Sequence, residues 1–210
     1  MIRNTVQRRA RRILPKLNNA LWEYRLGIST RGVFRPKDYL HGVWERHSYS
    51  TIPYRSIFKI LRFLALKNTD VFVDLGCGKG RVICCAARYD LVEVIGVEYL
   101  EHLSKLARRN LHQLRGRRSP VSVISGVAED FDFTQGTAFY LYNPFGPKTM
   151  SEILSKLRYG LDARDREVRI AYVNAMHEEL LADTPWLKHY GTLPPALPDN
   201  CDPTSFWISR

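Results

Sequence analysis

A glycine-rich segment carries the clearest chemical signal in the sequence. It reads Gly76-Cys77-Gly78-Lys79-Gly80 and follows the β-branched apolar run Val71–Leu75, which contains the acidic residue Asp74. Alternating glycines allow a tight turn, remove side chains that would block a ligand, and let the backbone amides at the start of the next helix face it. The segment therefore predicts a ligand-binding loop at the end of a buried strand.

A second acidic residue stands where an acid that binds ribose is expected. The next apolar run ends in Gly96-Val97-Glu98, and Glu98 follows Gly80 by 18 residues. A carboxylate at the end of the second strand can accept the hydrogens of both ribose hydroxyls, as it does in dinucleotide-binding proteins. Dinucleotide loops usually read GxGxxG, whereas this loop reads GxGxG after an acidic residue. Taken without the loop, Glu98 would be a solvated strand end or the first-turn acid of a helix.

The two segments together resemble the first motifs of class I S-adenosylmethionine-dependent methyltransferases, whose loop commonly reads apolar-x-Asp-Leu-Gly-x-Gly-x-Gly. The resemblance implies S-adenosylmethionine as the cofactor. It implies that Asp74 orients the methionine portion, directly or through water, and that Glu98 binds the ribose. It also implies cofactor contacts for the loop residues, namely Gly76, Cys77, Gly78 and Gly80.

A third acidic segment follows the third apolar run. Residues 125–131 resemble the methyltransferase segment that borders the adenine, which implies cofactor contacts for Ala128 and Glu129. Asp130 is the alternative acid, because Val127 stands where these families often place Asp. An exposed acidic loop is the other interpretation of this segment.

Residues 49–54, Tyr-Ser-Thr-Ile-Pro-Tyr, precede an apolar helix and the glycine loop. They resemble the corresponding segment of seven-strand protein lysine methyltransferases and related bacterial enzymes. This likeness implies that Tyr49 or Thr51 closes over the methionine end of the cofactor.

The nature of the methyl acceptor is indicated by Asn143-Pro144-Phe145, which follows the fourth apolar run. The segment resembles a shortened form of the Asn-Pro-Pro-aromatic motif of class I enzymes that methylate amino groups on nucleic-acid bases or protein side chains. There the Asn side-chain oxygen and a neighbouring carbonyl accept the hydrogens of the target nitrogen, so Asn143, Pro144 and Phe145 become the candidate catalytic residues. A turn that ends the strand and begins the next helix is the alternative.

The sequence contains no motif for hydrolases, NTPases or structural zinc sites. The chain lacks Gly-x-Ser-x-Gly, HExxH and P-loop sequences, so hydrolase and NTPase functions are not indicated. Its four cysteines form no CxxC pair and have no His/Cys spacing suited to zinc, which predicts reduced thiols and no structural metal. The four are Cys77, Cys84, Cys85 and Cys201.

The pattern around the candidate site residues predicts an α/β fold. Short apolar runs alternate with helical patterns from residue 53 onward, which predicts parallel strands with right-handed crossovers. We expect a doubly wound, mostly parallel seven-stranded sheet with helices on both faces and an antiparallel C-terminal edge hairpin. The strands are expected near residues 71–75, 93–98, 121–124, 138–142, 168–173, 186–190 and 205–209, and the helices near 53–66, 80–89, 103–114, 147–160 and 177–181. Gly116 and Gly160 are expected to end two of these helices.

Residues 1–52 are predicted to be a basic, partly helical extension of the methyltransferase domain at residues 53–210. Residues 1–38 hold ten Lys or Arg against two acidic residues, which is eight of the eleven excess positive charges. Spacings of three and four place apolar residues on one helical face: Val6, Ala10, Ile13, Leu14, Leu17 and Leu21. A helix docked on the domain, an arm that contacts an anionic partner, and an organelle-targeting peptide all fit this pattern.

Three functions therefore compete. The leading one is an S-adenosylmethionine-dependent methyltransferase that acts on a nitrogen of a protein side chain or nucleic-acid base. The alternatives are an NAD-type oxidoreductase and a non-catalytic protein that binds nucleic acid or a membrane surface through its basic N-terminus. No run of 18 apolar residues and no secretory signal appear, so a cytoplasmic location is expected, with surface association through the basic segment as a variant.

Overall fold

The computed structural model describes residues 16–32, 51–195 and 201–210. One seven-stranded sheet has the order β3-β2-β1-β4-β5-β7-β6, in which β7 alone runs antiparallel to its two neighbours. The predicted fold class is confirmed, and most strands begin and end within one residue of the expected positions; β6 runs three residues further than expected. The strands are β1 (Val71–Leu75), β2 (Glu93–Glu98), β3 (Val121–Ser125), β4 (Ala138–Tyr142), β5 (Arg169–Val173), β6 (Leu187–Leu193) and β7 (Thr204–Ser209).

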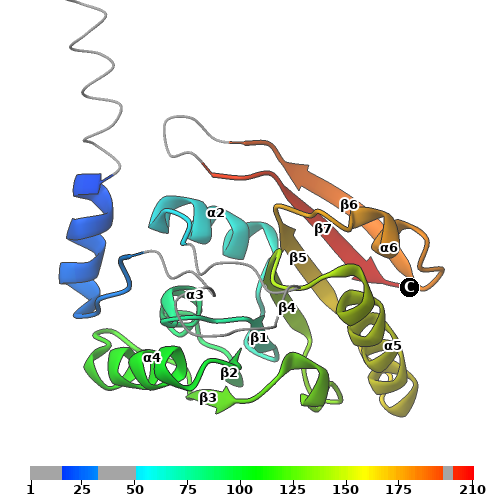
Figure 1. The fold of residues 1–210 in the computed structure, drawn as a ribbon, viewed down its shortest axis with the longest axis horizontal. Helices are drawn as coiled ribbons and strands as arrows, with labels where there is room; N and C mark the ends of the chain where they lie inside the picture. The colour runs from blue at the N-terminus through cyan, green and yellow to red at the C-terminus, as the bar shows by residue number, and fades with distance from the viewer. Residues whose placement is uncertain (1–15, 33–50, 196–200) are drawn as a thin grey trace, which may run out of the picture.

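Helices cover both faces of the sheet, as Figure 1 shows. One apolar core lies between the sheet and α2, α3, α4 and residues 26–28, and a second lies between the sheet and α5 and α6. Strands β1 and β5 are buried along their whole length, as expected for parallel strands with helices on both faces. The helices are α2 (Tyr54–Phe63), α3 (Arg81–Ala86), α4 (Glu101–Gln113), α5 (Pro147–Ala163) and α6 (Glu178–Ala182), with a short 3-10 turn η2 (Ala128–Asp130) and a further helix at residues 16–26.

The register of the sheet brings the predicted site residues to one edge. Strand order reverses between β1 and β4, so the connections after β1 and β4 leave in opposite directions and open a crevice there. Asp74 lies opposite Tyr140 of β4, and Glu98 ends the neighbouring strand β2. The crevice therefore lies where a doubly wound sheet normally binds its ligand.

Three predicted helix ends are wrong. Helix α2 ends at Phe63, before the expected residue 66, and α3 ends at Ala86, before residue 89. Helix α4 ends at Gln113, within one residue of the expected position, and Gly116 lies in the turn that follows it with φ +71°. Helix α5 continues through Gly160 to Ala163. A Cβ atom at Gly160 would lie 2.8 Å from the carbonyl oxygen of Phe133. Gly160 lacks a side chain because the backbone at Phe133 packs directly against the helix at this position. Its role is close packing inside α5 and not the end of the helix.

Gly160→Ala is expected to lower the free energy of unfolding by about 1–3 kcal/mol through overpacking, although alanine favours helices by about 1 kcal/mol over glycine. Urea denaturation would measure the change. Ser155→Ala, at an exposed position of the same helix, is the control and is expected to shift stability by about 0.5 kcal/mol or less. A Gly160→Ala protein more stable than the wild type would show that the contact with Phe133 imposes no constraint.

The described part of the N-terminal extension packs against the domain. Trp22 packs on Tyr54 and Phe58 with ring centroids 6.2 and 4.8 Å apart, and Leu26 is fully buried. Leu17 and Leu21 are 59% and 48% exposed, so the predicted apolar face is not the one that packs on the domain. The expected positions from Val6 to Leu14 lie outside the described residues, and the division at residue 52 and the partner of the basic segment stay predictions.

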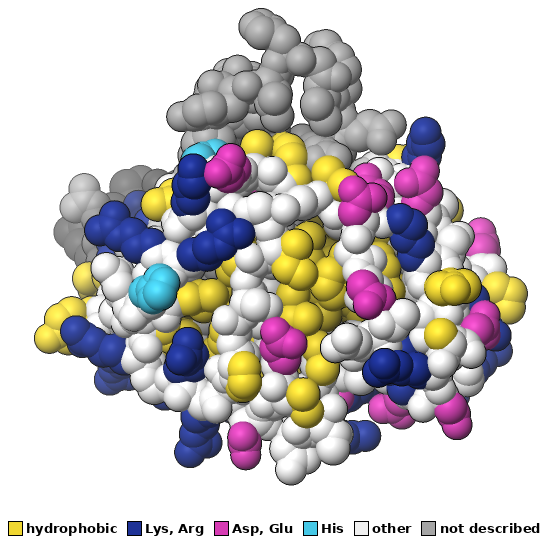
Figure 2. Space-filling model, turned by 90° about the horizontal axis from the view of Figure 1, so that it is seen from below, with side chains coloured by type: hydrophobic (Ala, Val, Ile, Leu, Met, Phe, Trp, Pro, Cys, Tyr) yellow, Lys and Arg dark blue, Asp and Glu magenta, His cyan; other side chains and the backbone are white. Residues whose placement is uncertain are grey.

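Positive charge does not dominate every face of the molecule. Figure 2 shows a face where hydrophobic side chains reach the surface at the centre and both Lys or Arg and Asp or Glu surround them. Mixed charges of this kind are typical of a solvated surface. Among the described residues, no helix has the length and apolar character needed to cross a membrane.

Candidate active site

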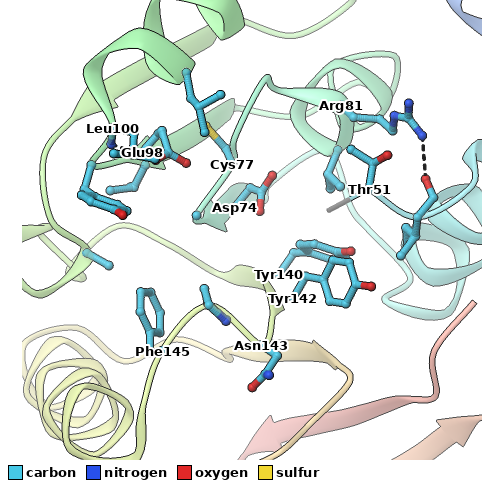
Figure 3. Close-up of a pocket in the computed structure, with 18 of the residues that line it drawn as sticks. Thr51, Asp74, Cys77, Arg81, Glu98, Leu100, Tyr140, Tyr142, Asn143 and Phe145 are labelled. Carbon is cyan, nitrogen blue, oxygen red and sulfur yellow. Dashed lines mark hydrogen bonds between the residues drawn. The ribbon is translucent and has the colours of Figure 1, made fainter. Parts of the chain in front are cut away.

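A pocket of about 360 Å³ lies at the carboxyl ends of β1, β2 and β4. Figure 3 shows Asp74, Cys77 and Glu98 on one side, facing Tyr140, Tyr142, Asn143 and Phe145. Ten predicted site residues line it: Thr51, Asp74, Gly76, Cys77, Glu98, Ala128, Glu129, Asn143, Pro144 and Phe145. Gly78 and Gly80 are not among the lining residues, and Tyr49 lies outside the described residues.

The glycine loop turns sharply at the end of β1. Gly76, Gly78 and Gly80 all have positive φ, at 87°, 55° and 82°, a backbone conformation that side chains disfavour. A Cβ atom at Gly76 would lie 3.1 Å from the Cβ atom of Pro144, so the loops after β1 and β4 meet there. The N–H groups of Gly76 and Cys77 both donate to the carbonyl oxygen of Val97, which ties the loop to β2.

Glu98 is fixed by the loop that it faces. Its Oε2 accepts from the Gly78 N–H and its Oε1 from the Leu100 N–H, both at 2.9 Å. A carboxylate has about four acceptor sites, which is the chemistry needed to accept the hydrogens of ribose hydroxyls. The side chain is 5% exposed, and its orientation is therefore set before a ligand arrives.

The inner wall of the pocket is acidic. Burial raises the pKa of the Asp74 carboxyl, and the nearby Glu98 carboxylate raises it further. Burial also raises the pKa of the Cys77 thiol, with Asp74 and Glu98 contributing, so this cysteine is a neutral part of the wall. A cationic ligand would relieve the repulsion between the two carboxylates. The sulfonium and ammonium groups of S-adenosylmethionine fit this wall better than the pyrophosphate of a dinucleotide.

Tyr140 adds a polar group that sequence reasoning missed. It is 2% exposed and lines the pocket, and its hydroxyl has no hydrogen-bond partner within the described part of the chain. A buried hydroxyl without a partner is costly, which fits a ligand group that accepts its hydrogen. The sequence could have indicated Tyr140 as a pocket residue, because the predicted strand 138–142 places Tyr140 and Tyr142 on one face.

Asn143 stands at the end of β4 in a strained conformation. Its φ is +36°, and Asn174, at the end of the neighbouring strand β5, has φ +50°. Both residues line the pocket. The Tyr172 hydroxyl donates to Asn143 Oδ1 at 3.4 Å, and the Asn143 N–H donates to the Val173 carbonyl at 3.1 Å. Left-handed conformations of this kind cluster at functional sites.

The opposite end of the pocket contains the acid expected near the adenine. Ala128 and Glu129 line it, whereas the alternative, Asp130, does not. The Thr149 hydroxyl donates to Glu129 Oε1 at 3.3 Å, and the Lys156 ammonium donates to the Glu129 carbonyl. Both contacts come from α5, which positions Glu129.

A buried cluster of Arg81, Glu23, Thr30 and Tyr54, here termed the Arg81 cluster, joins the N-terminal segment to the glycine loop. Arg81 begins α3 immediately after the loop and donates to Thr30 Oγ1 at 2.7 Å, to the Ile52 carbonyl at 3.0 Å and to Glu23 Oε1 at 3.3 Å. Its guanidinium lies 4.6 Å from the Tyr54 ring centroid. The N-terminal segment therefore supports one wall of the pocket.

Metal ligands are not grouped in this structure. Across residues 16–32, 51–195 and 201–210, no three His, Cys, Asp or Glu side chains could share a metal ion. The four cysteines are buried free thiols, and burial raises the pKa of Cys84 to about 12.

The sheet order, the glycine loop and the acid at the end of β2 together define the class I S-adenosylmethionine-dependent methyltransferase fold, as expected from the sequence. A family model described as "Histone methylation protein DOT1" matches residues 40–126. The solved structure of an RNA methyltransferase from Salinibacter ruber, in complex with S-adenosyl-L-homocysteine, superposes with a TM-score of 0.52 at 21% identity, over 76% of this chain and 92% of that one.

Two sequence relatives have names that specify lysine. A protein-lysine N-methyltransferase of Saccharolobus islandicus is 25% identical over 95 residues, covering 45% of this chain and 58% of the relative. An H3 lysine-79 specific histone-lysine N-methyltransferase of Dictyostelium discoideum is 28% identical over 102 residues, covering 42% of this chain and 6% of the relative. The chain thus spans less than two thirds of either relative. These comparisons support S-adenosylmethionine as the cofactor and do not favour the oxidoreductase or non-catalytic alternatives.

Proposed function

We propose that this protein transfers a methyl group from S-adenosylmethionine to the side-chain nitrogen of a lysine in a protein. One observation carries the proposal: two buried acids, Asp74 and Glu98, face Asn143 across a single pocket at the reversal point of the sheet. The names of the two sequence relatives favour lysine over a nucleic-acid base.

The residues of this chain serve mainly to bind and align. S-adenosylmethionine supplies an activated methyl group, so the protein needs orientation and a dry site more than reactive side chains. In this proposal Glu98 accepts the ribose hydroxyl hydrogens, while Asp74 and Tyr140 bind the methionine end with Thr51 beside them. Asn143 and the backbone of Pro144 and Phe145 accept hydrogens from the amine nitrogen.

Calorimetry with two ligands tests the cofactor assignment. S-adenosylhomocysteine is expected to bind and NAD is not, because the acidic wall opposes a pyrophosphate. Incubation of fractionated cell protein with tritium-labelled S-adenosylmethionine, followed by amino-acid analysis, is then expected to yield labelled methyllysine. Binding of NAD alone would end the proposal, and label found only in nucleic acid would correct the acceptor.

Asn143→Ala is expected to reduce methyl transfer about tenfold or more while leaving the affinity for S-adenosylhomocysteine within about twofold, because the amide oxygen proposed to accept from the amine is lost. The Tyr172 hydroxyl loses the same acceptor. Asn143→Gly is the companion variant, since it relieves the positive φ but also lacks the amide. If Asn143→Gly retained full activity, the residue would matter for the turn and not for the acceptor.

A further inference from the structure

Asn174 places a second side-chain amide at the acceptor end of the pocket. It directly follows β5, as Asn143 directly follows β4. The parallel register pairs Tyr142 with Val173, so the two asparagines leave neighbouring strands at the same level of the sheet. Both residues line the pocket, where Asn143 is 6% exposed and Asn174 is half-buried. The acceptor end therefore contains two amide groups from two strands.

The backbone holds Asn174 in place without its side chain. Its N–H donates to the Pro203 carbonyl at 2.9 Å, and its φ is +50°. Glycine adopts a positive φ more readily than asparagine does, so the turn alone does not explain the amide. Within the described part of the chain, this amide forms no hydrogen bond. The side chain is therefore available to a ligand in the pocket that it lines.

The hydrogens of a primary amine match this arrangement. The lysine ammonium has three N–H donors, and amide oxygens accept such hydrogens. In the proposed function Asn143 and a backbone carbonyl beside it supply two acceptors, and Asn174 adds a third. A methyl group on the nitrogen removes one donor and brings an apolar group against an amide. A site built to form hydrogen bonds with a group discriminates against an analogue that lacks it.

We infer that Asn174 binds the acceptor nitrogen and limits the reaction to one methyl group per lysine. The inference rests on the proposed function and goes beyond it by naming the product. The amine nitrogen loses one proton to solvent and forms a bond to the methyl carbon as the carbon–sulfur bond breaks. The products are monomethyllysine in its ammonium form and S-adenosylhomocysteine. A second transfer is disfavoured, because monomethyllysine would bind with its methyl group against one of the amides.

Mass spectrometry of labelled lysines tests the inference. Fractionated cell protein is incubated to completion with S-adenosylmethionine that carries a trideuterated methyl group, and the labelled methyl groups on each lysine are counted. The wild-type protein is expected to yield at least about tenfold more monomethyllysine than dimethyllysine. Asn174→Gly, which keeps the turn and lacks the amide, is expected to lower this ratio about tenfold. Asn174→Asp keeps an acceptor oxygen and should retain the wild-type ratio.

Ala65→Gly is the matched control, because it relieves another positive φ, +49°, at a residue that does not line the pocket. It should keep the wild-type ratio, and all three variants should bind S-adenosylhomocysteine within about twofold of the wild type in calorimetry. Dimethyllysine or trimethyllysine as the main wild-type product, or an unchanged ratio in Asn174→Gly, would overturn the inference and leave the proposed function intact. Absence of labelled methyllysine would overturn the proposed function, and the inference with it.

Discussion

Glu98→Ala is expected to weaken S-adenosylhomocysteine binding by about 100-fold or more. Hydrogen bonds to a charged acceptor contribute about 1.5–3 kcal/mol each, and 1.4 kcal/mol corresponds to a tenfold change in Kd. Under the proposed function, the substitution removes two such bonds to the ribose. It also deprives the N–H groups of Gly78 and Leu100 of their acceptor, which loosens the loop around the ligand. Calorimetric titration measures the loss directly.

The other end of β2 provides the control for this variant. Glu93 begins the strand that Glu98 ends, and its Oε1 accepts a hydrogen bond from Ser122 at 2.9 Å. Glu93→Ala removes the same side chain far from the crevice and is expected to leave the Kd within about twofold, since surface substitutions have small effects. A Glu98→Ala protein that binds S-adenosylhomocysteine within threefold of the wild type would refute the assignment of Glu98 to the ribose.

The part of the site built from strand ends could be predicted from the sequence. Asp74, Glu98 and Asn143 each lie at or directly after the end of a short apolar run, and parallel strands bring their carboxyl ends to one edge of the sheet. The order of the strands within the sheet was not predicted and comes from the structure. Tyr140 could have been added, because residues two apart on a strand share a face and Asp74 lies opposite it.

Contacts between segments far apart in the sequence could not be predicted. The hydrogen-bonded partners Tyr142 and Asp202 are separated by 60 residues, and Glu23 and Arg81 by 58. Neither pair follows a spacing that local geometry would impose. The apolar periodicity also predicted the wrong face of the helix at residues 16–26. This helix packs on the domain through a face that includes Trp22 and the buried acid Glu23. The burial of Glu23 depends on Arg81, a partner far away in the sequence.

The Arg81 cluster is therefore where the N-terminal segment affects the stability of the pocket. Glu23 and Arg81 are each about 5% exposed at the side chain, and burial alone would raise the pKa of Glu23. Hydrogen bonds from Thr30 and Arg31 outweigh that effect and lower this pKa. Breaking a buried ion pair from one side typically costs about 3–5 kcal/mol, because the remaining charge stays buried.

Arg81→Met removes the donors to Glu23, Thr30 and the Ile52 carbonyl and is expected to lower the free energy of unfolding by about 2–3 kcal/mol in urea denaturation. The loss stays below the cost of an isolated buried charge because Arg31 still pairs with Glu23. Arg158→Met is the matched control, because it breaks an exposed ion pair with Asp162 on α5 and should cost about 1 kcal/mol or less. The double variant Glu23→Gln/Arg81→Met should lose less than the sum of the two single variants, because the contact between Glu23 and Arg81 is then counted only once.

Amide hydrogen exchange separates this effect from a general loss of stability. Because residues 29–31 also contact the glycine loop, through Asn110 and through the Lys79 ammonium on the Arg31 carbonyl, Glu23→Gln is expected to speed exchange in residues 16–32 and 76–81 together. Faster exchange confined to residues 16–32 would show that the segment packs on the domain without supporting the pocket. Faster exchange in residues 16–32 and 76–81 together would show that the N-terminal segment stabilises the glycine loop of the proposed cofactor site.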